Sequence, residues 1–167
     1  MAGSFARALA HLGTGTGVVR RHFNRDAMAR IRAAIADAER GHAGEIRFAV
    51  EAMLPLRMLR RHRDARSRAV EVFSQLRVWD TEANSGVLLY LLWADRAIEV
   101  VVDRGIAALV PASEWETVCL QVRDGLRSAH PADAVIAGIA RIGELLRVAL
   151  PTQASTPDEL PDDPVRL

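Results

Sequence analysis

The stretch of sequence that decides the fold is GVLLYLLWADRAIEVVV, residues 86–102. Its first part, residues 86–93, is apolar at almost every position, as in a central strand that is covered on both faces. The Asp95-Arg96 pair predicts a tight turn, after which residues 98–102 resume a strand pattern. We therefore expect two antiparallel strands that are joined as a hairpin within a sheet.

A strand and a helix are predicted before this hairpin. Residues 45–51, EIRFAVE, alternate apolar and charged side chains, which predicts a half-buried strand. Residues 64–77 show helical spacing and would carry the chain across the sheet to residue 86. Because a strand–helix–strand crossover places its two strands parallel, the predicted sheet is mixed.

Further helices are expected to cover this sheet. Helical spacing predicts one over residues 26–40, and Ser113 with Glu116 forms a capping box that would open another. Pro131 would start a last helix that stops before Pro151. The predicted fold class is α/β, a three-layer α/β/α sandwich around a small mixed β-sheet.

The two ends of the chain are expected to lie outside this folded domain. Residues 1–23 predict a short amphipathic segment and a linker, and residues 24–150 carry the domain. Residues 151–167 hold four of the seven prolines together with several acidic residues. This composition predicts a disordered or loosely docked acidic tail.

The composition excludes several classes of protein. All 22 basic residues are arginine, which excludes Schiff-base chemistry, a lysine general base and a Walker-type phosphate loop. The formal net charge of +1 argues against a dedicated nucleic-acid binder, although arginines concentrate in the first half of the chain and acidic residues in the second. One cysteine allows no internal disulfide, and no stretch resembles a signal peptide or a membrane span, so we expect a cytoplasmic protein.

Oxygen-bearing side chains are expected to gather at one end of the sheet. Both parallel strands start at this end, and the antiparallel third strand finishes there. The side chains in question belong to Glu45, Asp80, Glu82, Asn84 and Asp103. Such hard ligands suit Ca²⁺ or Mg²⁺ better than zinc, so the sequence predicts a divalent-cation site. Solvated loop carboxylates and helix caps are the alternative interpretation.

Arginines offer two candidate sites for anions. Arg47 and Arg104 lie near the predicted metal site and could neutralise charge on a phosphoryl group there. Residues 57–68 hold six arginines and could contact an anionic partner or a membrane surface. The candidate anion-binding residues in this run are Arg60, Arg61 and Arg63. The absence of interleaved aromatic residues argues against nucleic acid, and a solvated basic face is the alternative.

The chain resembles the TPM domain family in three stretches. These are AIADAERGHAGEIRFAVE at residues 34–51, residues 68–106, and the Trp115 helix with AVIAGIARIGELL after it. The resemblance covers about residues 24–150 and is strongest to the short, stand-alone bacterial branch. It implies an α/β/α sandwich, divalent-metal binding at the loop end of the sheet, and a phosphatase assignment that is not uniform among members.

Two features depart from the family's pattern. Many relatives are exported or tethered to a membrane, whereas this sequence shows neither feature. The family's Asp-Asn-Gly before the central strand is here Asn84-Ser85-Gly86, so an amide stands where the family has a carboxylate. Glu82 is the candidate to supply the missing carboxylate.

The resulting expectation is a TPM-like binding or interaction domain that holds Ca²⁺ or Mg²⁺ and has no established catalysis. No organic cofactor is expected, and a protein or an anionic surface is the candidate partner. A metal-assisted phosphatase acting on phosphate monoesters is one alternative. An adaptor that uses residues 57–68 is the other.

Overall fold

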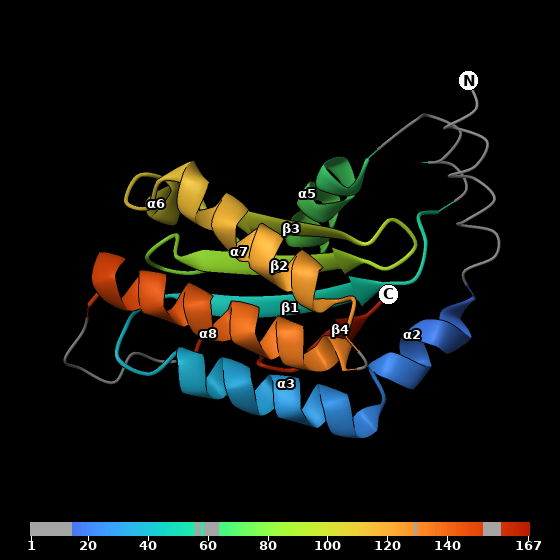
Figure 1. Cartoon of the computed structure of the whole chain (residues 1–167). Coiled ribbons are helices and arrows are strands. Elements are labelled where there is room, and N and C mark those ends of the chain that lie inside the picture. The colour runs from blue at the N-terminus through green and yellow to red at the C-terminus, as the bar shows by residue number, and fades with distance from the viewer. Residues whose placement is uncertain (1–14, 56–57, 59–63, 129, 152–157) are drawn as a thin grey trace.

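The sheet has four strands in the order β3-β2-β1-β4 (Figure 1). β1 (Glu45–Glu51) pairs in parallel with β2 (Gly86–Leu92), and β2 pairs antiparallel with β3 (Ala97–Val102). The predicted parallel pair and hairpin are therefore confirmed. The computed structural model describes residues 15–55, 58, 64–128, 130–151 and 158–167.

The strand register brings three chain segments to one end of the sheet. Glu45 lies opposite Gly86 in the parallel pair. The N–H of Asp103, just after β3, donates to the Gly86 carbonyl at 2.9 Å. We call this end of the sheet the loop end. β1 and β2 begin here and β3 ends here, as predicted.

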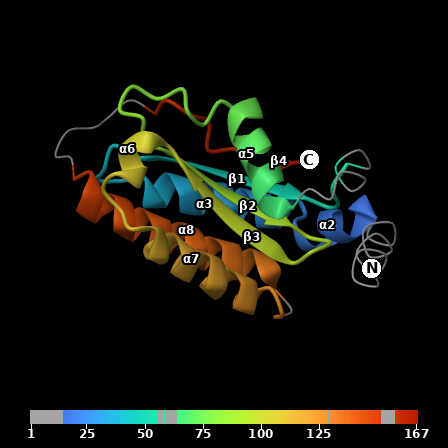
Figure 2. The same ribbon diagram turned by 90° about the horizontal axis from the view of Figure 1, so that it is seen from above.

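Helices cover both faces of the sheet, which confirms the α/β/α sandwich. One face carries α3 (Arg25–Ala38), α7 (Ala112–Gly125) and α8 (Pro131–Ala149), and the other carries α5 (Ala65–Gln75) (Figure 2). Two shorter helices were not predicted. They are α2 (Thr16–His22), which begins inside the expected linker, and α6 (Arg104–Ala107), which follows β3. No helix in the described ranges is long and apolar enough to cross a membrane.

Helix starts follow local capping chemistry in two cases. The side chain of Asn24 accepts a hydrogen bond from the N–H of Ala27 at 2.9 Å, and Asp64 caps α5 in the same way. The predicted capping box at Ser113 is wrong. α7 begins at Ala112 after Pro111, and no side chain caps it.

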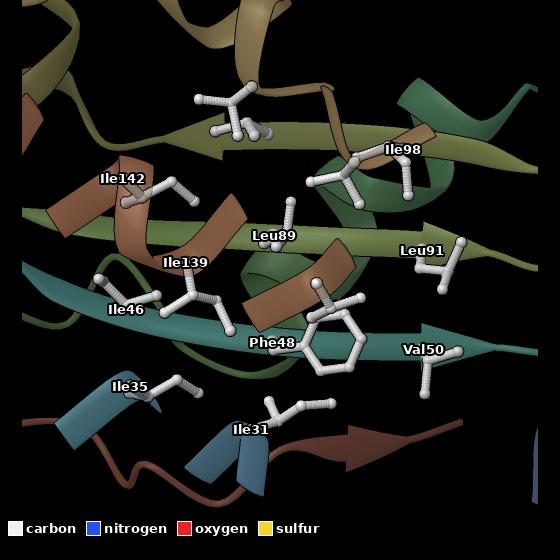
Figure 3. Packing of buried hydrophobic residues seen from close by; sticks show 14 of the residues in the cluster. Ile31, Ile35, Ile46, Phe48, Val50, Leu89, Leu91, Ile98, Ile139 and Ile142 are labelled. Carbon is white, nitrogen blue, oxygen red and sulfur yellow. The ribbon is translucent and has the colours of Figure 1, made fainter. Parts of the chain in front are cut away.

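The main core lies between the sheet and the three-helix layer. Ile31 and Ile35 of α3 and Ile139 of α8 pack against Phe48 and Leu89 of the strands (Figure 3). These side chains are fully buried. The apolar stripes of the helices and the inward residues of the strands therefore form one continuous cluster.

The second face of β1 is also covered, so the prediction of a half-buried strand is wrong. All seven residues of β1 are buried. The cover comes from α5 and from the C-terminal residues, where Leu160 is buried among Ala49, Tyr90 and neighbouring side chains. Charged residues of β1 that the alternation placed in solvent are therefore inside the protein.

The end of the chain is part of the fold. Val165–Arg166 forms β4, which pairs in parallel with Ala49 and Val50 of β1. The N–H of Leu167 adds a bond to the Val50 carbonyl at 2.9 Å. The described residues 158–167 thus differ from the expected loose tail, whereas the expected amphipathic stretch at residues 4–12 lies outside the described residues.

Candidate functional site

Asp103 is the central acidic residue of the loop end. Its Oδ1 accepts a hydrogen bond from the N–H of Arg104 at 2.7 Å and so caps α6. Its Oδ2 is buried and has no hydrogen-bond partner among the described residues. A buried polar atom without a partner calls for an explanation, and an ion is one of the usual ones.

Asn84 reaches the same place from the loop before β2. Its backbone lies in the left-handed region with φ at 51°, which asparagine tolerates better than most residues. Its side-chain Oδ1 accepts a hydrogen bond from Nε of Arg104 at 3.0 Å. The structure therefore brings Asn84, Asp103 and Arg104 together, as the topology predicted.

Gly105, within α6, allows the loop before β2 to pack closely against this helix. A Cβ at this position would lie 2.6 Å from the carbonyl oxygen of Asn84 and 2.7 Å from that of Ala83. Such a close approach requires glycine. It places two backbone carbonyl oxygens beside the first turn of α6, close to the residues that follow Asp103 in the chain.

The other predicted metal ligands are not gathered into one group. Among the described residues, no three of Glu45, Asp80, Glu82 and Asp103 bring carboxylate oxygens within 4.8 Å of one another. Asp80 and Glu82 are both exposed. The backbone N–H of Glu82 donates to Oε2 of Glu159 at 2.9 Å, so this loop contacts the C-terminal segment.

Glu45 is buried beneath the C-terminal segment. Its Oε2 accepts a hydrogen bond from the N–H of Leu160 at 3.2 Å. Burial raises the pKa of Glu45, and the negative charges of Asp158 and Glu159 raise it further, against the lowering effect of the backbone hydrogen bonds. Glu45 thus serves to anchor the C-terminal segment.

A carboxylate cluster that the sequence did not predict lies next to Glu45. One oxygen each of Glu39, Asp158 and Asp162 lie within 4.8 Å of one another. Burial raises the pKa of Glu39 to about 9, to which the charges of Glu45 and Asp162 contribute. Because Glu39 retains its proton at neutral pH, this cluster is less negative than its composition indicates. Sequence reasoning missed it because two of its members lie in the segment expected to be a loose tail.

Arg47 does not join the loop-end group. It is 6% exposed and lines a cavity between α3 and residues 161–166, whose lining includes neither Asn84 nor Asp103. Burial lowers the pKa of Arg47, against the opposite effect of Asp163 and Asp162. Of the two arginines predicted to neutralise a phosphoryl group at the metal site, only Arg104 lies beside the predicted ligands.

Part of the arginine run is committed to contacts within the domain. Arg60, Arg61 and Arg63 lie outside the described residues. Arg66 donates from Nη1 to the Val100 carbonyl at 2.5 Å. Arg68 is buried, so it offers no charge to an external surface.

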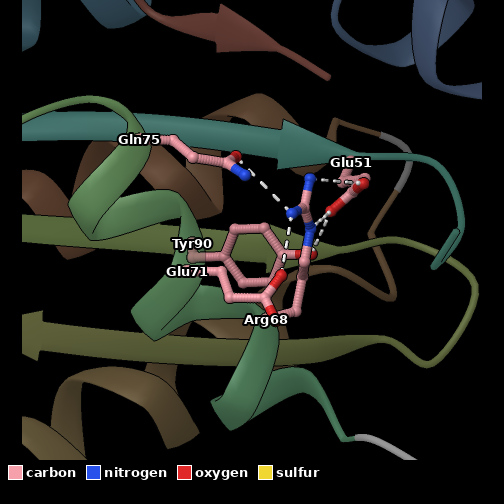
Figure 4. Close-up of polar contacts among 5 residues, drawn as sticks. All are labelled: Glu51, Arg68, Glu71, Gln75 and Tyr90. Carbon is pink, nitrogen blue, oxygen red and sulfur yellow. Dashed lines mark hydrogen bonds and ion pairs between the residues drawn. The ribbon is translucent and has the colours of Figure 1, made fainter. Parts of the chain in front are cut away.

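Arg68 belongs to a closed polar network at the far end of β1 (Figure 4). Its Nε and Nη2 donate to the two oxygens of Glu51 at 2.8 and 3.1 Å. The hydroxyl of Tyr90 donates to Oε2 of Glu51 at 2.6 Å, and Nη1 of Arg68 reaches Glu71 at 3.3 Å. Bidentate pairing of this kind satisfies a buried arginine, so the network stabilises the fold and leaves little capacity for a ligand.

Comparisons with known proteins agree with this architecture. A family model described as TPM domain matches residues 20–145, a range that includes Asn84 and Asp103. The NMR structure of BA42 protein from the psychrophilic bacterium Bizionia argentinensis is similar to this chain with a TM-score of 0.74 and 27% sequence identity. The similarity covers 84% of this chain and 92% of that one. No curated protein matches the sequence.

Proposed function

The chain belongs to the TPM domain family, and we propose that it is a binding domain that holds Ca²⁺ or Mg²⁺ at the loop end of its sheet. Asp103 would be the central ligand, with the carbonyl oxygens of Ala83 and Asn84 nearby. The observation that carries the proposal is the buried Oδ2 of Asp103, which no described residue satisfies.

The donor atoms at the loop end favour a hard cation. They are carboxylate and carbonyl oxygens, which Ca²⁺ and Mg²⁺ prefer over nitrogen or sulfur ligands. Ca²⁺ suits the irregular loop geometry better, because Mg²⁺ demands a near-ideal octahedron. Asn84 supplies an amide rather than a second carboxylate, and the low ligand charge predicts weak binding, with a dissociation constant of about 0.1–1 mM.

Calorimetric titration with CaCl₂ and with MgCl₂ tests the proposal. The wild type should bind at least one of the two ions, and Asp103→Asn should weaken binding at least about tenfold because it removes the carboxylate of the proposed site. Asp103→Asn retains an oxygen that can cap α6, so the fold should persist. Asp124→Asn, an exposed aspartate on α7, is the matched control and should bind as the wild type does. Absence of binding to either ion, or unchanged binding by Asp103→Asn, would contradict the proposal.

Two substitutions should strengthen binding. Asn84→Asp adds a carboxylate where the backbone already has a left-handed conformation that aspartate accepts. Arg104→Gln removes a guanidinium that donates to Asn84 Oδ1 and repels a cation. Each should lower the dissociation constant at least about fivefold, since two unit charges 4 Å apart interact by about 1 kcal/mol even in water. A gain in affinity for the cation cannot be explained by damage to the fold.

The same variants test the alternative of a metal-assisted phosphatase. Release of phosphate from 4-nitrophenyl phosphate is measured with and without Mg²⁺. Turnover that depends on the metal and is lost in Asp103→Asn would favour catalysis over binding alone. A metal ion bound at this site would supply Lewis-acid chemistry, and Arg104 would hold a phosphoryl oxygen.

A further inference from the structure

A cavity of about 840 Å³ lies between α3 and the C-terminal segment, away from the loop-end group. Its charged lining is strongly basic. Four arginines line it, namely Arg25, Arg32, Arg47 and Arg166, against the single carboxylate of Asp163. The remaining wall is mainly apolar and includes Met28 and Pro161. A basic cavity with an apolar wall fits an organic anion better than a cation or a neutral ligand.

Arg47 is the unusual member of this lining. Although 94% of the residue is buried, its Nε and Nη1 have no hydrogen-bond partner among the described residues. Arg68 provides the comparison inside the same domain: it is equally buried, but Glu51 satisfies it from both oxygens. Buried guanidinium groups are normally paired in this second way. Arg47 therefore has hydrogen-bond donors available for a ligand, whereas the donors of Arg68 are occupied by Glu51.

The aspartates that act on Arg47 leave these donors unused. Asp163 forms its ion pair with Arg32, at 3.6 Å, rather than with Arg47. Asp162 and Asp163 raise the pKa of Arg47 through their charges, yet neither bonds to Nε or Nη1, and Oδ1 of Asp162 is itself buried with no partner among the described residues. With Asp163 of the lining and Asp162, which also acts on Arg47, both counted, the four arginines leave two excess positive charges. This excess matches a dianion better than a monoanion.

We propose that this cavity binds a phosphate monoester, with the phosphate held by Arg47 and the surrounding arginines and the organic part against Met28 and Pro161. The planar guanidinium donates two parallel hydrogen bonds to phosphate oxygens, which is the geometry that arginine offers and lysine does not. The site shares no lining residue with the proposed cation site, so the two proposals can fail separately.

Phenyl phosphate is the probe for this site. Calorimetry and thermal unfolding are measured in a buffer free of phosphate and divalent cations, with inorganic phosphate and phenol as comparison ligands. Phenyl phosphate should bind and raise the unfolding temperature, inorganic phosphate should bind more weakly, and phenol should have no effect. Equal affinity for inorganic phosphate, or no binding of phenyl phosphate, would overturn the proposal.

Variants of the full chain separate binding from folding. Arg47→Met should weaken phenyl phosphate binding at least tenfold, yet the ligand-free protein should unfold at the same or a higher temperature, because a buried cation without partners is removed. Asp163→Asn should tighten binding, because it frees Arg32 and removes the one acidic residue of the lining. Arg30→Gln is the matched control on α3, since Arg30 pairs with Asp133 and does not line the cavity.

The opposite stability result has a clear meaning. If Arg47→Met or Asp162→Asn lowers the unfolding temperature of the ligand-free protein, Arg47 is satisfied by its own carboxylate neighbours and the proposal is wrong. Unchanged phenyl phosphate binding by Arg47→Met would overturn it as well.

Discussion

The backbone N–H of Leu160 donates to Oε2 of Glu45 at 3.2 Å, although 115 residues separate the two in the chain. Glu45 opens β1 and is buried, and the Leu160 side chain is buried on the same face of the sheet. One residue of the C-terminal segment therefore satisfies a buried carboxylate and also fills the core. The final residues of the chain are thus a structural part of the domain.

Shortening this side chain should destabilise the protein. Leu160→Ala should lower the free energy of unfolding by about 2–4 kcal/mol, because it leaves a cavity in the hydrophobic cluster between α5 and the sheet. Urea unfolding followed by circular dichroism measures the change. Leu120→Ala removes the same atoms at a position that is 48% exposed and should change stability by less than about 1 kcal/mol. Equal effects of the two substitutions would contradict the docking of Leu160.

The stability of the protein should fall as the pH rises from about 5 to 9. Burial raises the pKa of Glu39 to about 9, whereas its ordinary value is about 4.3. The folded state therefore binds a proton that the unfolded state releases in this window, so its advantage is complete at low pH and lost above pH 9. Glu45, whose pKa burial also raises, acts in the same direction.

Glu39→Gln is the variant that tests this pH dependence. Urea unfolding at pH 5, 7 and 9 should show a flatter profile for Glu39→Gln than for the wild type. Glu116→Gln, at an exposed position on α7, should leave the profile unchanged. Parallel profiles for the wild type and Glu39→Gln would show that Glu39 loses its proton at its ordinary pKa.

The buried pair of Arg68 and Glu51 should respond differently to single and double substitution. Glu51→Leu leaves a buried guanidinium with only longer contacts, such as that to Glu71, and should lower the free energy of unfolding by about 3–5 kcal/mol. Adding Arg68→Met should recover most of this loss, because the remaining charge is removed. Arg141→Met breaks exposed pairs with Glu114 and Glu144 and should change stability far less in the same assay. No recovery in the double variant would mean that the pair itself stabilises the fold.

Two glycines should respond in opposite directions to a methyl group. A Cβ at Gly86 would lie 1.8 Å from the carbonyl oxygen of Val78, so backbone must move and Gly86→Ala should lower stability by at least about 1–3 kcal/mol. A Cβ at Gly17 in α2 meets nothing within 4 Å, so Gly17→Ala should raise stability by about 0.5–1 kcal/mol. Thermal unfolding of both variants in one buffer checks the sign of each change.

Much of the sheet could be predicted because its signals are local. The alternation over residues 45–51 and the apolar run before Asp95-Arg96 placed the strands, and topology then placed Asn84 and Asp103 at one end. The faces were harder to predict. Arg47 and Glu51 alternate with apolar residues as solvent-facing charges do, and only distant segments, α5 and residues 158–166, bury them.

The polar details of the candidate sites could not be predicted from the sequence. Whether Oδ2 of Asp103 or Nε of Arg47 has a partner depends on the positions of neighbouring atoms, which spacing does not encode. β4 is two residues long, too short for any periodic signal. The segment of Asp158 and Asp162 is rich in proline and acidic residues, which predicts a loose tail, yet it packs on β1 and brings both carboxylates to Glu39.

The pairing of β4 with β1 also bears on how the protein avoids self-association. An uncovered β1 would be a free edge strand of seven residues, which is a template for strands of other molecules. β4 covers only Ala49 and Val50, and Pro161 and Pro164 lie just before it. Proline has no N–H to donate to a further strand, so the segment that carries β4 is a poor site for another molecule to add a strand. Truncation of the C-terminal segment would therefore remove both a structural element and the protection of the sheet against aggregation.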